Sequence, residues 1–209
     1  MITGGPMTKR QQGDAQQINE LLYQALETEL GGELIYKAAI SCAVTPDLKE
    51  EWEGYLDETK THQDVLLNVF QQIGLDPAKQ TPGRKVLSHI ANSLVKAMEM
   101  AKKEADPKAA ELVAAECVVL AETKDTMNWG LIGVVAEQSS NKQLAQALKE
   151  AHDQVAQDEG HHLYHTKGWG RELWIQSLGF PAALPPPEEQ KQVETAIGAS
   201  RAEQQREKM

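Results

Sequence analysis

The sequence predicts an all-α protein built from long helices, and three observations indicate this fold class. Apolar and small residues recur three or four positions apart over several long stretches, which is the period of one helix face. Aromatic residues make up only 5% of the 209 residues, whereas strands favour aromatic side chains, so an all-β fold is excluded. Turn residues, among them Pro46 and Pro107, separate the periodic stretches.

Residues 15–73 predict a first helical hairpin. The stretch 15–43 has one apolar face, which a single carboxylate, Glu29, interrupts. Pro46 suits the first position of a second helix, which runs to Ile73 and stops before Gly74. Two long helices joined by so short a turn lie antiparallel. The face of the second helix contains Leu48, Trp52, Tyr55, Thr59, His62, Leu66, Val69 and Ile73.

A connector and a second hairpin follow. In order, the pattern indicates a loop at 74–83, a helix at about 84–104, a third long helix from Pro107, a break at 139–141 and a fourth long helix to about 178. The face of the third helix again contains a carboxylate, Glu122, and the face of the fourth becomes polar towards His162. Residues 15–178 therefore predict an antiparallel four-helix bundle with a long helical crossover between the two hairpins.

The two ends of the chain differ from the bundle in composition. Residues 1–14 are polar, and we expect a flexible N-terminus. Residues 179–209 consist of a Pro-rich break and a polar tail with few large apolar side chains, which predicts disorder or an exposed helix.

Charge and cysteine usage exclude several classes of partner. The net charge is −10 and no basic stripe is present, so we expect no nucleic-acid partner. No run of 18 apolar residues and no signal peptide are present, so we expect no membrane association. Cys42 and Cys117 are the only cysteines, which excludes a sulfur-rich metal site and fits a cytoplasmic protein.

Carboxylates in the apolar faces predict a polar site inside the bundle. An unpaired buried carboxylate costs several kcal/mol, so Glu29 and Glu122 need a partner. Folding each hairpin about its turn places Glu29 beside Glu58 and His62, and Glu122 beside Asp158, Glu159 and His162. Each lone glutamate also has an aromatic ring seven residues later on the same face, at Tyr36 and Trp129.

This set of residue types is typical of a metal site. In Glu159-x-x-His162 a carboxylate and an imidazole lie one turn apart, as two ligands of one ion on a single helix must. Carboxylate and imidazole ligands without thiolate suit iron or manganese, and affinity makes zinc possible as well.

On these residues the chain resembles the ferritin-like superfamily of di-iron carboxylate proteins. The resemblance covers about residues 15–170 and implies six metal ligands, namely Glu29, Glu58, His62, Glu122, Glu159 and His162. One departure lies in the second helix, where Thr61 stands three residues after Glu58 and the histidine stands four residues after it. That spacing rotates His62 by about 100° around the helix from the family's position.

The resemblance implies a function as well as a fold. A non-haem site of two iron ions, or manganese, would react with dioxygen or peroxide, as an oxidoreductase or a stress-protection protein, with or without a small organic substrate. No Cys-x-x-Cys pair is present, so a peroxidase of this type would need an external electron donor. The alternative is a metal-free ferritin-like protein that acts by assembly or partner binding, for example as a homodimer through the crossover helix.

Several assignments within the cluster stay open at this point. Glu33 or Asp158 could replace a neighbouring ligand, and Glu29 and Glu122 could also fall on their faces by chance in a chain with 31 acidic residues. His161 and His165 are either outer hydrogen-bond partners or structural histidines. Tyr36 and Trp129 are either site residues or packing aromatics. We expect structural roles for His89, Cys42 and Cys117.

Overall fold

The computed structural model describes residues 11–206, and over that range the chain is helical, with 83% helix and no strand, so the all-α prediction is confirmed. The helices are α1 (Ala15–Cys42), α2 (Pro46–Ile73), α3 (Pro82–Glu104), α4 (Pro107–Gln138), α5 (Lys142–Ser177), α6 (Pro187–Gln190) and α7 (Ala196–Arg206). Within the described part of the chain, no helix combines the length and the apolar run that a membrane crossing needs.

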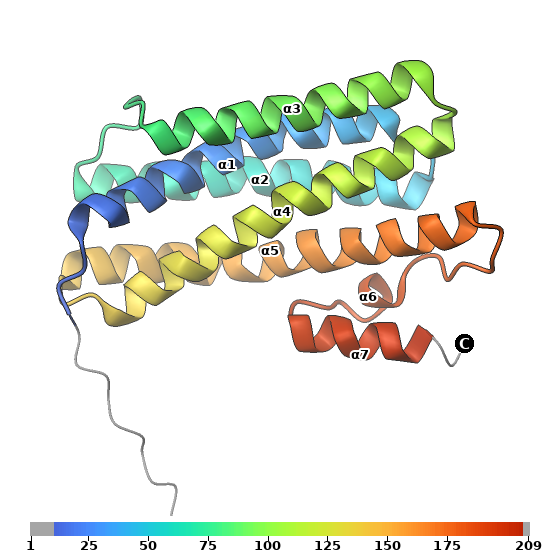
Figure 1. The fold of residues 1–209 in the computed structure, drawn as a ribbon. Coiled ribbons are helices and arrows are strands. Elements are labelled where there is room, and N and C mark those ends of the chain that lie inside the picture. The colour runs from blue at the N-terminus through green and yellow to red at the C-terminus, as the bar shows by residue number, and fades with distance from the viewer. Residues whose placement is uncertain (1–10, 207–209) are drawn as a thin grey trace, which may run out of the picture.

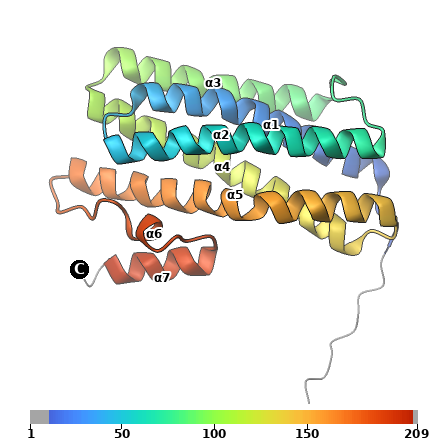
Figure 2. The same cartoon turned by 180° about the vertical axis from the view of Figure 1, so that it is seen from behind.

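The four longest helices, α1, α2, α4 and α5, form a bundle. Contacts join α1 to α2, α2 to α5, α5 to α4 and α4 back to α1, so the four helices close a ring. The connector α3 packs across α1 and α4 on the outside of this ring (Figure 1), and the view from behind shows α2 and α5 on the opposite face (Figure 2). The connection through α3 makes α2 and α4 run in the same direction.

Local signals set the helix ends. Asp14, Asp106 and Asn141 each accept backbone N–H bonds at the start of α1, α4 and α5. The predicted crossover helix begins two residues early, because Thr81 caps it and Pro82 occupies its first position. At the end of α2, Gly74 adopts the left-handed conformation with φ 74°.

The apolar core lies in two halves separated by a polar layer. One half contains Tyr36, Trp52 and Trp169, and the other contains Leu22, Phe70 and Trp129. The carboxylates and histidines predicted for the site occupy the middle of α1, α2, α4 and α5, between these halves. Burial of the two apolar halves therefore holds the polar residues at one level of the bundle.

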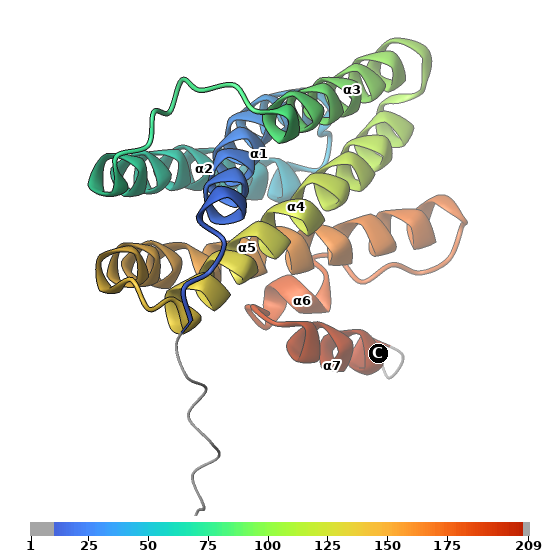
Figure 3. The same ribbon diagram turned by 60° about the vertical axis from the view of Figure 1, so that its left-hand side comes forward.

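The C-terminal segment, residues 178–206, packs along α5 (Figures 1 and 3). Glu188 in α6 is 2% exposed and accepts two hydrogen bonds from the Arg171 guanidinium, at 2.6 and 2.9 Å. Of the two alternatives predicted for the tail, α7 is a largely exposed helix, and only Ala202 in it is buried. Periodicity could not reveal this docking, because a buried ion pair between distant segments holds it.

Most of the predicted flexible N-terminus, residues 1–10, lies outside the described residues. Gln11 forms two backbone hydrogen bonds where α4 ends: its N–H donates to Gln138 O in the last residue of α4, and its carbonyl accepts from Ser140 N–H in the following loop, both over 2.9 Å. Residues 11–14 therefore join the first helix to the second hairpin.

Candidate metal centre

Two groups of metal-binding side chains lie side by side in the polar layer. Glu29, His62 and Glu159 form one group, and Glu122, Glu159 and His162 form the other. In each group, one ligand atom from every residue lies within 4.8 Å of the others. All five residues are at most 3% exposed. Glu159 belongs to both groups, so one carboxylate lies between two candidate ion positions.

The two histidines direct the same ring nitrogen towards the buried carboxylates. His62 Nδ1 lies 3.5 Å from Glu29 Oε1 and 3.2 Å from Glu159 Oε1. His162 Nδ1 lies 3.7 Å from Glu122 Oε2 and 4.0 Å from Glu159 Oε1. The two rings stack with centroids 5.6 Å apart. Each imidazole thus presents Nδ1 to a pocket of carboxylate oxygens.

The outer nitrogens of these histidines bind half-exposed carboxylates. His62 Nε2 lies 3.2 Å from Asp158 Oδ2, and His162 Nε2 lies 2.8 Å from Glu58 Oε2. The side chains of Asp158 and Glu58 are 34% and 44% exposed. A carboxylate on the far nitrogen fixes the orientation of an imidazole and raises its basicity as a ligand. The exchange is reciprocal, because each carboxylate comes from the helix of the other histidine.

Two aromatic residues hold the lone glutamates. Tyr36 donates its hydroxyl to Glu122 Oε1 over 2.9 Å, and Trp129 donates its indole N–H to Glu29 Oε1 over 2.8 Å. Tyr36 and Trp129 are 0% and 1% exposed, and they also pack in the two halves of the core. Each of these two aromatic residues therefore both packs in the core and donates a hydrogen bond to a lone glutamate.

Burial and mutual proximity perturb the proton affinity of the centre. Burial raises the pKa of Glu159 to about 8, although His62 opposes the shift. Burial alone would lower the pKa of His62 and His162, but the surrounding carboxylates outweigh it and raise those pKa values to about 12 and about 10. Positive charge is therefore strongly favoured inside this layer, either as protons on the imidazoles or as a bound cation.

The residues present fit a metal pair. Three buried ligand atoms, His62 Nδ1, Glu122 Oε2 and Glu159 Oε2, have no hydrogen-bond partner among the described residues. Buried polar atoms are normally partnered, so such atoms need an explanation, and an ion bound between them supplies one. The donors are carboxylate oxygen and imidazole nitrogen, which suit iron and manganese.

The structure brings five of the six predicted ligands together. Glu58 lies outside both groups, at the rim, where it binds the outer nitrogen of His162. The position three residues before His62 belongs to Thr59, which is 3% exposed. Glu33 also lies outside the groups, since its carboxylate accepts hydrogen bonds from Lys37 and Gln63. Asp158 likewise binds an outer nitrogen and does not replace a ligand.

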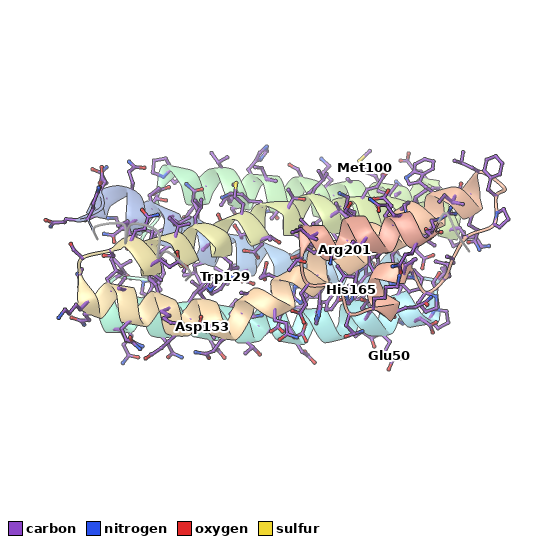
Figure 4. The ribbon with its side chains drawn as sticks, turned by 90° about the horizontal axis from the view of Figure 1, so that it is seen from below. Glu50, Met100, Trp129, Asp153, His165 and Arg201 are labelled. Atoms are coloured by element: carbon purple, nitrogen blue, oxygen red, sulfur yellow. The ribbon has the colours of Figure 1, made fainter. Side chains whose placement is uncertain are left out.

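A further polar cluster continues from the centre beneath the C-terminal segment. His165 is 3% exposed, and its Nδ1 lies 3.0 Å from Glu51 Oε1 and 3.1 Å from the Tyr55 hydroxyl. The Tyr55 ring lies 4.2 Å from the His162 ring, centroid to centroid. His161 stacks on His165, and His89 is exposed on α3. Seen from below, Arg201 on α7 and His165 lie in the same half of the molecule, and Trp129 lies in the other (Figure 4).

One buried acid was missed by the sequence reasoning. Asp125 on α4 is 5% exposed, and burial together with the charges of Glu29, Glu159 and Glu122 raises its pKa well above the usual range. The signal that could have found it is the spacing Glu122-x-x-Asp125, which repeats that of Glu159-x-x-His162.

Comparison with known proteins does not assign this centre to a family. No family model, no curated protein and no solved structure matches the chain. The geometry of the centre is therefore the basis for assigning a function.

Proposed function

We propose that this chain is a ferritin-like, non-haem di-metal carboxylate protein that binds two iron or manganese ions and reacts with dioxygen or peroxide. The observation that carries the proposal is the pair of buried donor groups that share Glu159. A ferritin-like site takes single glutamates from two helices and carboxylate–histidine pairs from the other two, and this centre matches that set except that α2 contributes His62 without a carboxylate.

Each residue would have a defined role toward the ions. Glu159 would bridge them, with Glu29 and His62 on one side and Glu122 and His162 on the other. Bound Fe(II) would supply electrons to dioxygen or peroxide and become Fe(III), and an external electron donor would be needed to return it to Fe(II). The two halves of the core exclude water, and the hydrogen bonds from Tyr36 and Trp129 fix one oxygen of each lone glutamate.

The half-exposed carboxylates supply a route for cations from solvent. Glu58 and Asp158 lie at the surface of the α2–α5 side and bind the outer nitrogens of the two histidines. Their negative charge attracts divalent ions to the point on the surface nearest the centre. The same two carboxylates then orient the imidazoles toward the ions.

Metal analysis tests the proposal. The purified full chain is analysed by inductively coupled plasma mass spectrometry, then loaded anaerobically with Fe(II) and exposed to dioxygen while the near-ultraviolet spectrum is recorded. We expect two ions per chain and a new oxo-ferric absorption. His162→Ala should lose metal, whereas the exposed His89→Ala serves as the matched control. Absence of bound metal both before and after loading would overturn the proposal.

A second candidate function, metal-free self-assembly, is favoured by an exposed apolar face on α4. Its exposed residues are Leu120, Met127, Leu131 and Val134, at spacings of seven, four and three. Beside Leu120, a groove of about 350 Å³ between α3 and α4 is lined by Ile90 and Leu94. Apart from the buried Glu122 and Asp125, Lys124 is the only charged residue of α4 between Glu116 and Glu137. Exposed apolar faces of this kind mark contacts with partners.

Sedimentation analysis tests the second candidate. A wild-type chain that sediments as a dimer at micromolar concentration, with Leu131→Glu monomeric and equally helical, would support assembly through α4. A wild-type monomer at all concentrations would contradict it. A metal-free dimer would favour this candidate over the first.

A further inference from the structure

Outside the four-helix ring lies an apolar groove with a cation at one end. The groove, about 350 Å³ in volume, lies between α3 and α4, and α1 forms its floor. It opens because α3 and α4 diverge from the short loop that joins them (Figures 1 and 3). Among its lining residues are the aliphatic Ile35, Leu87, Leu94 and Leu120 and the polar Thr28 and Lys124.

Small residues bring α3 close to α1 and so shape the floor of the groove. A Cβ at Gly31 would lie 2.7 Å from Ala91 Cβ, so a larger residue at position 31 would push α3 outward. Ala91 and Ile35 are buried in this floor, whereas Ile90 and Leu120 are exposed along the rim. The groove therefore offers apolar surface below and on both sides.

The pairing of α3 with α4 decides which residues share an end of the groove. The two helices are antiparallel about the loop at 105–106, which brings Leu87 to about the level of Lys124. Leu94 lies about 10 Å farther along α3, at 1.5 Å per residue. Thr28 lies at the Lys124 end, because Asn128 on α4 donates its amide to Thr28 Oγ1 over 3.0 Å. One end is therefore polar and the other aliphatic.

Lys124 is a partly buried cation without an acid partner in the described structure. Its ammonium donates a hydrogen bond to Oδ1 of the buried Asn128. Burial lowers the pKa of Lys124, and Asp125, whose charge opposes this, is itself a buried acid with a pKa well above its usual range. A partly buried charge is costly unless it is paired, so this position favours an anion.

The other polar group of the lining is already satisfied. The Thr28 hydroxyl donates to Gln24 O over 2.8 Å and accepts the bond from Asn128. Lys124 is therefore the lining group that is left to bind a polar headgroup. A purely apolar occupant, such as the face of a second copy, would bury its charge without a counter-ion.

The chemistry and size of the groove together select the occupant. Apolar walls favour a hydrocarbon chain, and a single ammonium at one end favours a carboxylate on that chain. If a methylene group takes about the 30 Å³ of a water molecule, the groove holds roughly ten carbons.

We infer that this groove binds a single-chain carboxylate of medium length, with the hydrocarbon between α3 and α4 and the headgroup on Lys124. The inference is independent of the proposed metal function, because the groove lies outside the ring that encloses the metal centre. It also differs from the assembly candidate, which depends on the α4 face beyond the groove, at Met127, Leu131 and Val134.

The test compares two probes of equal chain length and opposite charge, decanoate and decyltrimethylammonium. Each is titrated calorimetrically into the metal-free full chain below its critical micelle concentration. The net charge of −10 would favour the cation in any non-specific binding. We expect one decanoate per chain, bound at least tenfold more tightly than the cation, with a negative heat-capacity change from apolar burial.

Variants assign the binding to the groove. Lys124→Met keeps a long side chain without its charge, and we expect decanoate affinity to fall at least tenfold while the cation binds as well or better. Lys96→Met removes an exposed cation of α3 outside the lining and is the matched control. Ile90→Glu adds an acid at the exposed rim and should also weaken decanoate binding. If circular dichroism shows that Lys124→Met is misfolded, Lys124→Gln replaces it.

Three outcomes would overturn the inference. They are a wild-type chain that prefers the cation, Lys124→Met binding decanoate with wild-type affinity, and a wild-type chain that binds no decanoate. In the last case Leu131→Glu is titrated as well, since binding that appears only after a dimer is separated would make a second copy the occupant. Metal binding is measured separately, so failure here leaves the di-metal proposal standing.

Discussion

Trp129 on α4 donates its indole N–H to Glu29 Oε1 on α1 over 2.8 Å, across the centre of the bundle. The reciprocal bond runs from Tyr36 on α1 to Glu122 on α4 over 2.9 Å. The two lone glutamates are therefore each held by the helix that carries the other. This exchange ties α1 to α4 and leaves the second oxygen of Glu122 directed at the donor groups.

Removing either aromatic donor should destabilise the metal-free protein. Trp129→Phe and Tyr36→Phe keep a ring in the core but leave Glu29 or Glu122 without its donor. Because an unsatisfied buried acceptor is costly, we expect each change to lower the free energy of unfolding by about 1–3 kcal/mol. Urea denaturation with a circular dichroism readout measures this. Unchanged midpoints in both variants would show that the two hydrogen bonds contribute nothing to stability.

Replacing a lone glutamate should lower stability both without and with metal, for different reasons. Glu122→Gln removes the buried carboxylate that helps to raise the pKa of His162 to about 10, so the metal-free variant should be less stable than the wild type at neutral pH. With excess Mn²⁺ the wild type should gain thermal stability by mass action, whereas the variant should gain less. Differential scanning calorimetry in both states measures this, with the exposed Glu137→Gln as control. Equal gains in the two proteins would exclude Glu122 as a ligand.

A side chain at Gly160 should release the C-terminal segment and leave the bundle folded. A Cβ there would overlap the backbone carbonyl of Glu194, whereas a Cβ at Gly130 on α4 would meet no atom within 4 Å. We expect Gly160→Ala to remove the hydrogen-exchange protection of residues 187–206 while α1 to α5 keep theirs. Gly130→Ala, the matched control, should be neutral or stabilising by up to about 1 kcal/mol. Unchanged protection in Gly160→Ala would contradict the docking described here.

Docking of the same segment should weaken as the pH rises. Burial, and after it the charge of Glu51, raises the pKa of Glu189 in α6 to about 7. Between about pH 4.5 and 7, the Glu189 carboxyl therefore keeps its proton in the docked segment, whereas it has lost that proton in the undocked segment. Its contribution to docking is therefore present at low pH and lost as the pH rises through 7. Hydrogen exchange at pH 6 and 8, corrected for intrinsic rates, should show the change, and Glu189→Gln should abolish it.

The helices and most of the candidate site could be predicted because both depend on short-range patterns. Each long helix begins and ends within two residues of its predicted bounds, since Pro46, Pro107 and Asn141 act through their own backbone. Glu29 and Glu122 were predictable because a carboxylate in an apolar stripe is buried wherever the stripe is buried.

The outward position of Glu58 could not be predicted, because neighbouring residues on a helix point 100° apart and either spacing keeps the pair near one face. Packing against α5 decides that Thr59 faces inward and Glu58 faces the rim. Asp125 was missed for a related reason: it lies beside the stripe on α4, and only the convergence of α1 and α5 on that side buries it.

The sequence by itself determined the all-α class, the order and bounds of the long helices, and the acids and histidines that lie on their inner faces, because helix period and capping act within a few residues. The tertiary structure alone decided that Glu159 is shared between two donor groups, that Tyr36 and Trp129 exchange partners, and that residues 178–206 dock on α5. These relationships join atoms from different helices, and only the packing of the two apolar halves sets the distances between them.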